Sequence, residues 1–200
     1  MKSDVIVVNS KGSAIESALN QVDAVAVYKK LSPKGSLQLH LLTEELIGMI
    51  SSVTGETMGE YWIEEDDGLY QLHLRVLTRM SSHKREKLLS ATTSGKNDAA
   101  RGFFGRLRDL FDRDADSDVV AFTPLMAEGF YDGGSATAHD LEWSMSRYRD
   151  EVGIHREQKE IAAIDAWDEL EKSVVAHVAD EVKVFIRGDE VEMVIYKKLA

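Results

Sequence analysis

A glutamate on the apolar face of a predicted helix is the first residue of this chain that could do chemistry. Residues 36–53 carry apolar side chains at three- and four-residue steps, which predicts an amphipathic helix that Ser36 could cap. Glu45 falls within the apolar stripe, between Leu42 and Met49. A carboxylate on a packed face is costly unless a partner satisfies it. Two interpretations stay open: Glu45 lies at the edge of the stripe and reaches water, or this face borders a pocket and Glu45 points into it.

A second candidate is a short loop that precedes another helix. A helix predicted for residues 99–111 follows four small or polar residues, namely Ser94, Gly95, Lys96 and Asn97. Free amide groups at the start of a helix favour anions, and Lys96 adds a positive charge. The loop is not a Walker A motif, because the first glycine of that motif would fall at Ser90 and Asn97 replaces the magnesium-binding Ser or Thr. It is either a phosphate contact or a plain connection to the helix.

Basic residues are concentrated in one stretch of an otherwise acidic chain. The formal net charge is −11, which argues against general nucleic-acid binding. From Arg75 to Arg108, however, nine Lys and Arg residues stand against two acids. This stretch is either a docking surface for an anion or acidic partner, or a solvated surface paired with the protein's own acids. Within it, Arg101 could neutralise phosphate charge, and Gly102 and Gly105 interrupt the helix, which suggests close packing or a bound group.

Other kinds of site find little support. The six histidines show no His-x-x-x-His or His-Glu-x-x-His spacing, and there is no cysteine, so we expect no metal site. A Gly-x-Ser-x-Gly nucleophile elbow is also missing from the sequence. The apolar run near the start is too short for a signal peptide, and no run approaches the roughly 18 residues of a membrane span. We therefore expect a cytoplasmic protein.

The elements that must position these residues suggest an α+β fold. A strand is predicted for residues 4–8, and helices for residues 13–31, 139–164 and 165–179. Two hairpins are predicted, at residues 59–78 through an Asp-Gly turn and at residues 181–197 through a Gly-Asp turn. In the first hairpin Gln71, His73 and Arg75 alternate with apolar residues, so one face is buried and the other is wet or lines a cleft. Strands in hairpins and helices in groups predict a mostly antiparallel sheet with helices on one face.

This order of elements resembles the GHKL-type (histidine-kinase-like) ATPase domain, and within it the small bacterial regulatory ATPases such as anti-sigma-factor serine/threonine kinases. The resemblance is one of layout and covers roughly residues 4–111 and 165–198. It implies a single domain over residues 1–200, built as a two-layer sandwich with a mixed, mostly antiparallel sheet. It also implies an enlarged lid or helical insertion at about residues 113–164. In that family a helix carries a catalytic Glu, followed four residues later by an Asn that holds the magnesium of ATP.

The sequence departs from this family at two anchors. It keeps Glu45 but has Met49 at the Asn position, and a thioether is a poor ligand for magnesium. The family's adenine-binding Asp would fall near residues 77–80, where there is neither Asp nor Gly. The later glycine box of the family corresponds either to residues 102–105 or to a segment just before the helix that contains residues 167–178.

Two functions follow from the resemblance, and a third interpretation does without it. The first is a non-catalytic or weakly nucleotide-binding regulatory protein, anti-sigma-factor-like, whose partner is another protein such as a sigma factor or an anti-sigma antagonist. The second is a divergent ATP-dependent serine/threonine kinase or ATPase, with Glu45 as base and Lys96, Arg101 and Arg106 beside the phosphates. The third is an α+β domain of unrelated descent. ATP is the cofactor to consider, no nucleic-acid or membrane partner is expected, and a homodimer is left open.

Overall fold

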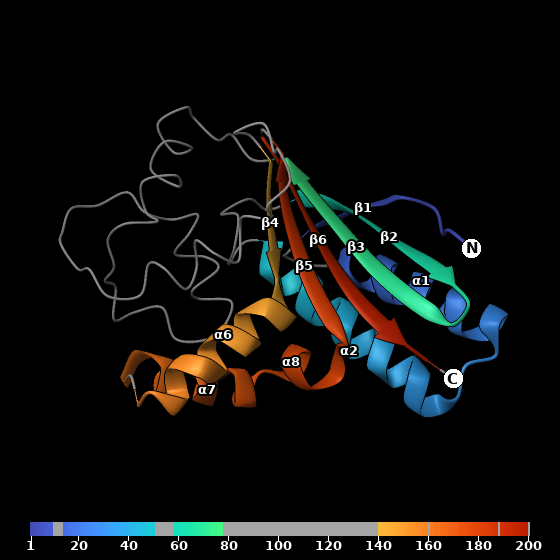
Figure 1. Ribbon diagram of the computed structural model, residues 1–200. Coiled ribbons are helices and arrows are strands. Elements are labelled where there is room, and N and C mark those ends of the chain that lie inside the picture. The colour runs from blue at the N-terminus through green and yellow to red at the C-terminus, as the bar shows by residue number, and fades with distance from the viewer. Residues whose placement is uncertain (10–13, 51–57, 78–139, 160, 188, 200) are drawn as a thin grey trace.

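The computed structural model describes residues 1–9, 14–50, 58–77, 140–159, 161–187 and 189–199. These residues form a six-stranded sheet in the order β1-β2-β3-β6-β5-β4, with helices on one of its faces (Figure 1). The predicted α+β sandwich is confirmed. Every described strand pair is antiparallel, which agrees with the mostly antiparallel sheet that was predicted; the described strands include no parallel pair. The strands are β1 (Ile6–Asn9), β2 (Met58–Asp66), β3 (Leu69–Leu77), β4 (Asp140–Ser144), β5 (Glu181–Arg187) and β6 (Glu190–Lys198).

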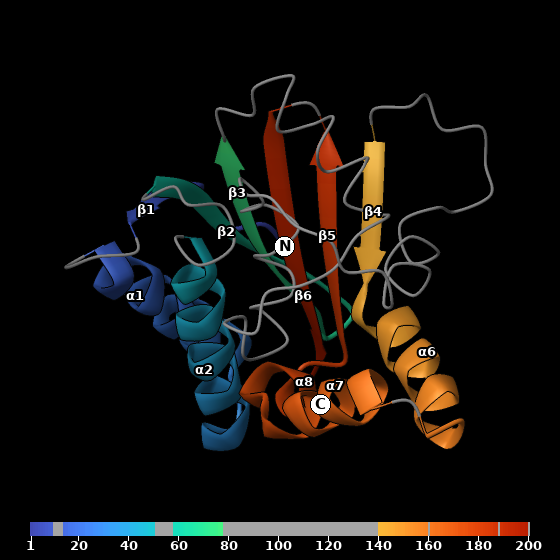
Figure 2. The ribbon, with the colours of Figure 1, turned by 90° about the vertical axis from the view of Figure 1, so that its left-hand side faces the viewer.

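The described helices come in two groups that follow the chain order. The N-terminal pair is α1 (Ala14–Lys29) and α2 (Pro33–Met49), which lie side by side under β1, β2 and β3 (Figure 2). The C-terminal group is α6 (Met145–Glu157), α7 (Ile161–Lys172) and α8 (Val174–Val178), with α6 against β4 and β5. Contacts between α2 and α8 join the two groups. Within the described ranges, no helix combines the length and the apolar character needed to cross a membrane.

The hairpin of β2 and β3 has the predicted turn. Asp67 and Gly68 both have positive φ, at 46° and 76°, as a tight two-residue turn requires. A Cβ on Gly68 would lie 2.7 Å from the carbonyl oxygen of Leu199, so this turn also packs closely against the C-terminal segment. The register pairs Trp62 with His73, which puts these two side chains on the same face of the sheet.

Helix α2 begins three residues earlier than the sequence pattern suggested. Ser32, rather than Ser36, is the N-cap, and its hydroxyl accepts a hydrogen bond from the amide of Gly35 at 3.1 Å. Pro33 therefore occupies the first turn of α2, where its missing N–H costs nothing. Residues 30–32 connect α1 to α2, and Lys30 among them has a positive φ of 53°.

The region predicted as one helix over residues 139–164 is divided differently. Residues 140–144 form the edge strand β4, which pairs with β5, and Ser144 then caps α6. Trp143 is buried in the core, and the pairing with a distant strand outweighs a local pattern that helix and strand share. The helix predicted for residues 165–179 is also two helices, because Ser173 caps α8 separately.

Candidate functional site

Glu45 and Met49, the two predicted site residues that the structure describes, lie in different environments. The Glu45 side chain is exposed on α2, as the first of the two interpretations requires. Met49 is only 2% exposed and belongs to the hydrophobic core. The two residues therefore do not share one open surface, although they are one helical turn apart.

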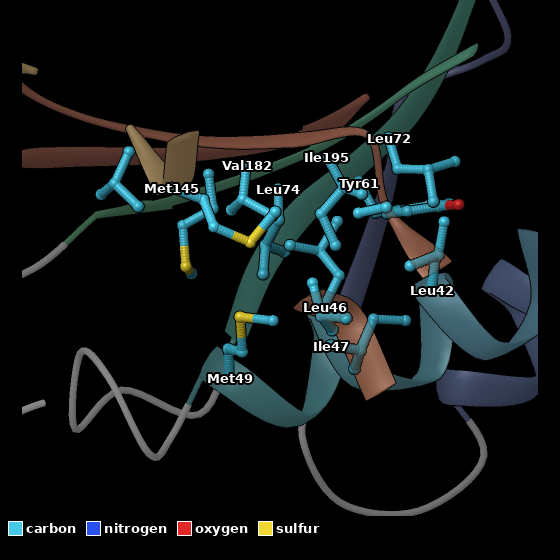
Figure 3. Close-up of a cluster of buried hydrophobic side chains, with 14 of the residues drawn as sticks. Leu42, Leu46, Ile47, Met49, Tyr61, Leu72, Leu74, Met145, Val182 and Ile195 are labelled. Carbon is cyan, nitrogen blue, oxygen red and sulfur yellow. The ribbon is translucent and has the colours of Figure 1, made fainter. Parts of the chain in front are cut away.

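Met49 packs where α2 meets the sheet. Figure 3 shows its side chain pointing from α2 towards the side chains of the sheet, in a cluster that includes Leu74 and Met145. The residues of α2 that face the sheet are all apolar except Thr43. A thioether is well suited to such a place because it is flexible and fills irregular gaps.

Thr43 is the polar group that α2 directs into this core. Its hydroxyl lies 2.8 Å from the hydroxyl of Tyr61 on β2, and both residues are fully buried. Burial raises the pKa of Tyr61 well above its ordinary value of 10.0, so the phenol stays protonated. Each hydroxyl thus satisfies the other, and the pair fixes the position of α2 on the sheet.

The remaining predicted site residues lie outside the described residues. They are Gly95, Lys96, Asn97, Arg101, Gly102 and Gly105. Of the basic stretch from Arg75 to Arg108, the structure describes Arg75 and places it on β3. Its guanidinium donates to Glu60 at 3.0 Å from Nε and lies 4.0 Å from Glu190. For Arg75, the alternative of pairing with the protein's own acids is the one observed.

The face of the sheet opposite the helices carries a cluster that the sequence alone did not reveal. The rings of Trp62 and His73 stack with their centroids 4.7 Å apart and an angle of 10° between their planes. Nδ1 of His73 donates to Oε1 of Glu192 on β6 at 2.9 Å. Trp62 and His73 are only 7% and 8% exposed, although none of the described helices covers this face. We call these three residues the sheet-face cluster.

Ion pairs extend from the sheet-face cluster across the sheet. Lys2 lies 5.0 Å from the centre of the Trp62 ring and donates to Glu64 at 2.8 Å. Nε1 of Trp62 donates to the same carboxylate at 2.9 Å. On the other side, Lys183 donates to Glu142 at 2.8 Å. The charged side chains of this face are thus largely held in place by one another.

The two rings of the sheet-face cluster are buried. The carboxylate of Glu192 accepts the hydrogen bond from His73, and Nε2 of His73 is buried with no hydrogen-bond partner among the described residues. Among the described residues, no group of three or more His, Asp or Glu side chains is arranged to hold a metal ion. The strand alternation predicted the face on which His73 lies. Its partners on β2 and β6 depend on strand pairing, which no local pattern could supply.

Because Glu192 is paired with His73, we expect the folded state to become less stable in acid. The hydrogen bond from His73, with Arg187 and Arg75 nearby, holds the pKa of the Glu192 carboxyl below its ordinary value of 4.5, against the opposing effect of burial. A carboxyl with a lower pKa in the folded state stabilises the fold above pH 4.5, and this contribution disappears as the pH falls through the folded-state pKa. We expect the urea midpoint to fall with acidification below about pH 4.5, and to fall less steeply in Glu192→Gln. Identical slopes for the two proteins would contradict this role of the pair.

Comparisons with known proteins leave the family open. No protein-family model matches the chain, and no curated protein or solved structure matches it significantly. The function must therefore be inferred from the residues and their geometry.

Proposed function

We propose that this chain is a regulatory protein of the anti-sigma-factor-like kind, which acts by binding another protein and not by transferring phosphate from magnesium-ATP. The observation that carries the proposal is the burial of Met49, which is 2% exposed. The resemblance to GHKL-type ATPases requires a magnesium ligand at this position. A thioether enclosed among apolar side chains offers magnesium no oxygen.

The packing of α2 supports the layout on which the proposal depends. The helix that carries Glu45 lies against β3 and β6, as the framework of an ATPase of this type would need. The polar residue on the buried side of this helix is Thr43, which bonds to Tyr61 and is not available to a nucleotide. The buried side of α2 is thus used for packing, which agrees with a regulatory role that does not need bound nucleotide. The proposal includes a cytoplasmic location, which the lack of cysteine favours.

The test is thermal unfolding with and without nucleotide. A ligand that binds only the folded state raises the melting temperature. Because we propose that the protein does not use magnesium-ATP, we expect millimolar ATP with magnesium to leave the melting temperature unchanged. Magnesium alone and ATP with a chelator serve as controls. A rise of several degrees that requires both magnesium and ATP would contradict the proposal.

A second measurement identifies the alternative, a divergent kinase or ATPase. Phosphate release from ATP is followed for the wild type and for Glu45→Gln, a substitution at an exposed position that should leave the fold intact. Release that is lost in Glu45→Gln would establish Glu45 as a catalytic base and overturn the proposal. No release from either protein agrees with a binding function.

A further inference from the structure

The outer side of α2 carries a stripe of four residues that the fold leaves uncovered. Lys34, Leu37, Leu41 and Glu44 follow one another at steps of three, four and three residues, so they lie along one side of the helix. Leu37 is 60% exposed, Lys34 and Glu44 are exposed, and Leu41 is half-buried. We call these four residues the α2 stripe.

The α2 stripe is apolar in the middle and oppositely charged at its ends. Within the part of the chain that the structure describes, neither Lys34 nor Glu44 has an ion-pair partner. Steps of three and four residues are those by which helices pack in coiled coils and bundles. The opposite side of α2 is already used, since Leu39, Leu42 and Leu46 face the core.

The positions in the stripe are symmetric about the level of Leu39. Leu37 and Leu41 lie two residues before and after it, and Lys34 and Glu44 lie five residues before and after it. A second α2 that runs antiparallel, with a two-fold axis at this level, therefore brings Leu37 of each copy to Leu41 of the other. The same register brings Lys34 of each copy to Glu44 of the other. Such self-complementarity is what an isologous two-fold interface requires.

We infer that the α2 stripe is a homodimer interface, in which α2 of one protomer packs antiparallel on α2 of a second copy. The neighbouring helix α1 runs beside α2 (Figure 2) and also carries an exposed apolar residue, Val27, which is 79% exposed. The stripe from Lys34 to Glu44 is about 15 Å long, so the interface lies at the small end of the size range of specific interfaces, and we expect a weak dimer. This inference does not depend on the proposed function.

Sedimentation over a range of protein concentrations provides the first test. The wild type should shift from a monomer of 22.3 kDa to twice that mass as its concentration rises. Leu37→Glu places a carboxylate opposite Leu41 and should raise the dissociation constant at least about tenfold. Because Leu37 is exposed, the melting temperature of a dilute monomer should not change. Ile161→Glu, at a comparably exposed residue on α7, is the matched control and should dimerise like the wild type.

Charge exchange tests the register. Lys34→Glu and Glu44→Lys should each weaken the dimer, because each variant places like charges together at both ends of the interface. The double variant carries both exchanges in every copy and restores opposite charges, so it should recover most of the affinity. A double variant as weak as the single ones would overturn the antiparallel register.

Disulfide formation tests the same geometry without relying on affinity. The chain has no cysteine, so Leu37→Cys and Leu41→Cys each introduce a single thiol. Upon oxidation, an equal mixture of the two variants should form a mixed dimer that exceeds either self-linked dimer. Preferential linkage of Leu37→Cys to itself would contradict the register. A wild type that stays monomeric at all concentrations would overturn the inference as a whole.

Discussion

Replacing Met49 by asparagine is expected to destabilise the protein without creating a magnesium-ATP site. Asparagine is the residue that the resemblance to GHKL-type ATPases would place there, but Met49 is buried and points towards the side chains of the core (Figure 3). The substitution removes apolar contacts and buries an amide with no partner among the surrounding apolar side chains. Together these effects should lower the free energy of unfolding by about 3 kcal/mol. Urea unfolding measures the loss, and thermal unfolding with magnesium-ATP tests for a gained site.

Met49→Leu is the matched control for this experiment. It keeps the volume and apolar character of the side chain, so it should cost less than about 1.5 kcal/mol. If Met49→Asn were as stable as Met49→Leu and bound ATP in a magnesium-dependent way, position 49 would face a nucleotide cleft. The proposed function would then lose the observation that carries it.

Removing the two hydroxyls of the Thr43–Tyr61 pair one at a time is expected to cost more stability in total than removing both together. Tyr61→Phe leaves the Thr43 hydroxyl buried without its partner, and Thr43→Val does the same to the phenol of Tyr61. Each single substitution should cost about 1–3 kcal/mol, because an unsatisfied buried donor loses its hydrogen bond to water and gains nothing. Urea unfolding of both single variants gives the two values.

The double variant Thr43→Val/Tyr61→Phe completes the cycle. It removes both polar groups at once, so it should lose clearly less stability than the sum of the two single variants. A double variant whose loss equals that sum would show that the two hydroxyls do not act as a pair. The Thr43–Tyr61 contact would then not be what fixes α2 on β2.

The proposed partner binding and the proposed dimer make separate demands on α2. Its core side, with Thr43 and Met49, holds the framework together, whereas its outer side, with Leu37 and Glu44, is left for a second copy. A variant such as Leu37→Glu can therefore abolish dimerisation while the nucleotide tests keep their outcome. Failure of one proposal leaves the other standing.

The sequence by itself determined the elements whose signals are local. The Asp67–Gly68 turn was predictable because only certain residues accept positive φ, and the second hairpin followed from strand alternation on both sides of its turn. The apolar periodicity of α2 was also local, as was the position of His73 on the face opposite the helices. These features together were enough to predict the α+β class.

Only the tertiary structure decided how these elements meet. Residues 140–144 form strand β4 because they pair with the edge of β5. This partner lies about 40 residues away in the sequence, so no local pattern could predict the pairing. Likewise, Glu192 reaches His73 across strands that are 119 residues apart in the chain. The environment of Met49 was also undecided, because periodicity places a side chain on a face but does not show what covers that face. Long-range pairing and packing set these outcomes, since their free energy depends on neighbours that the local sequence does not specify.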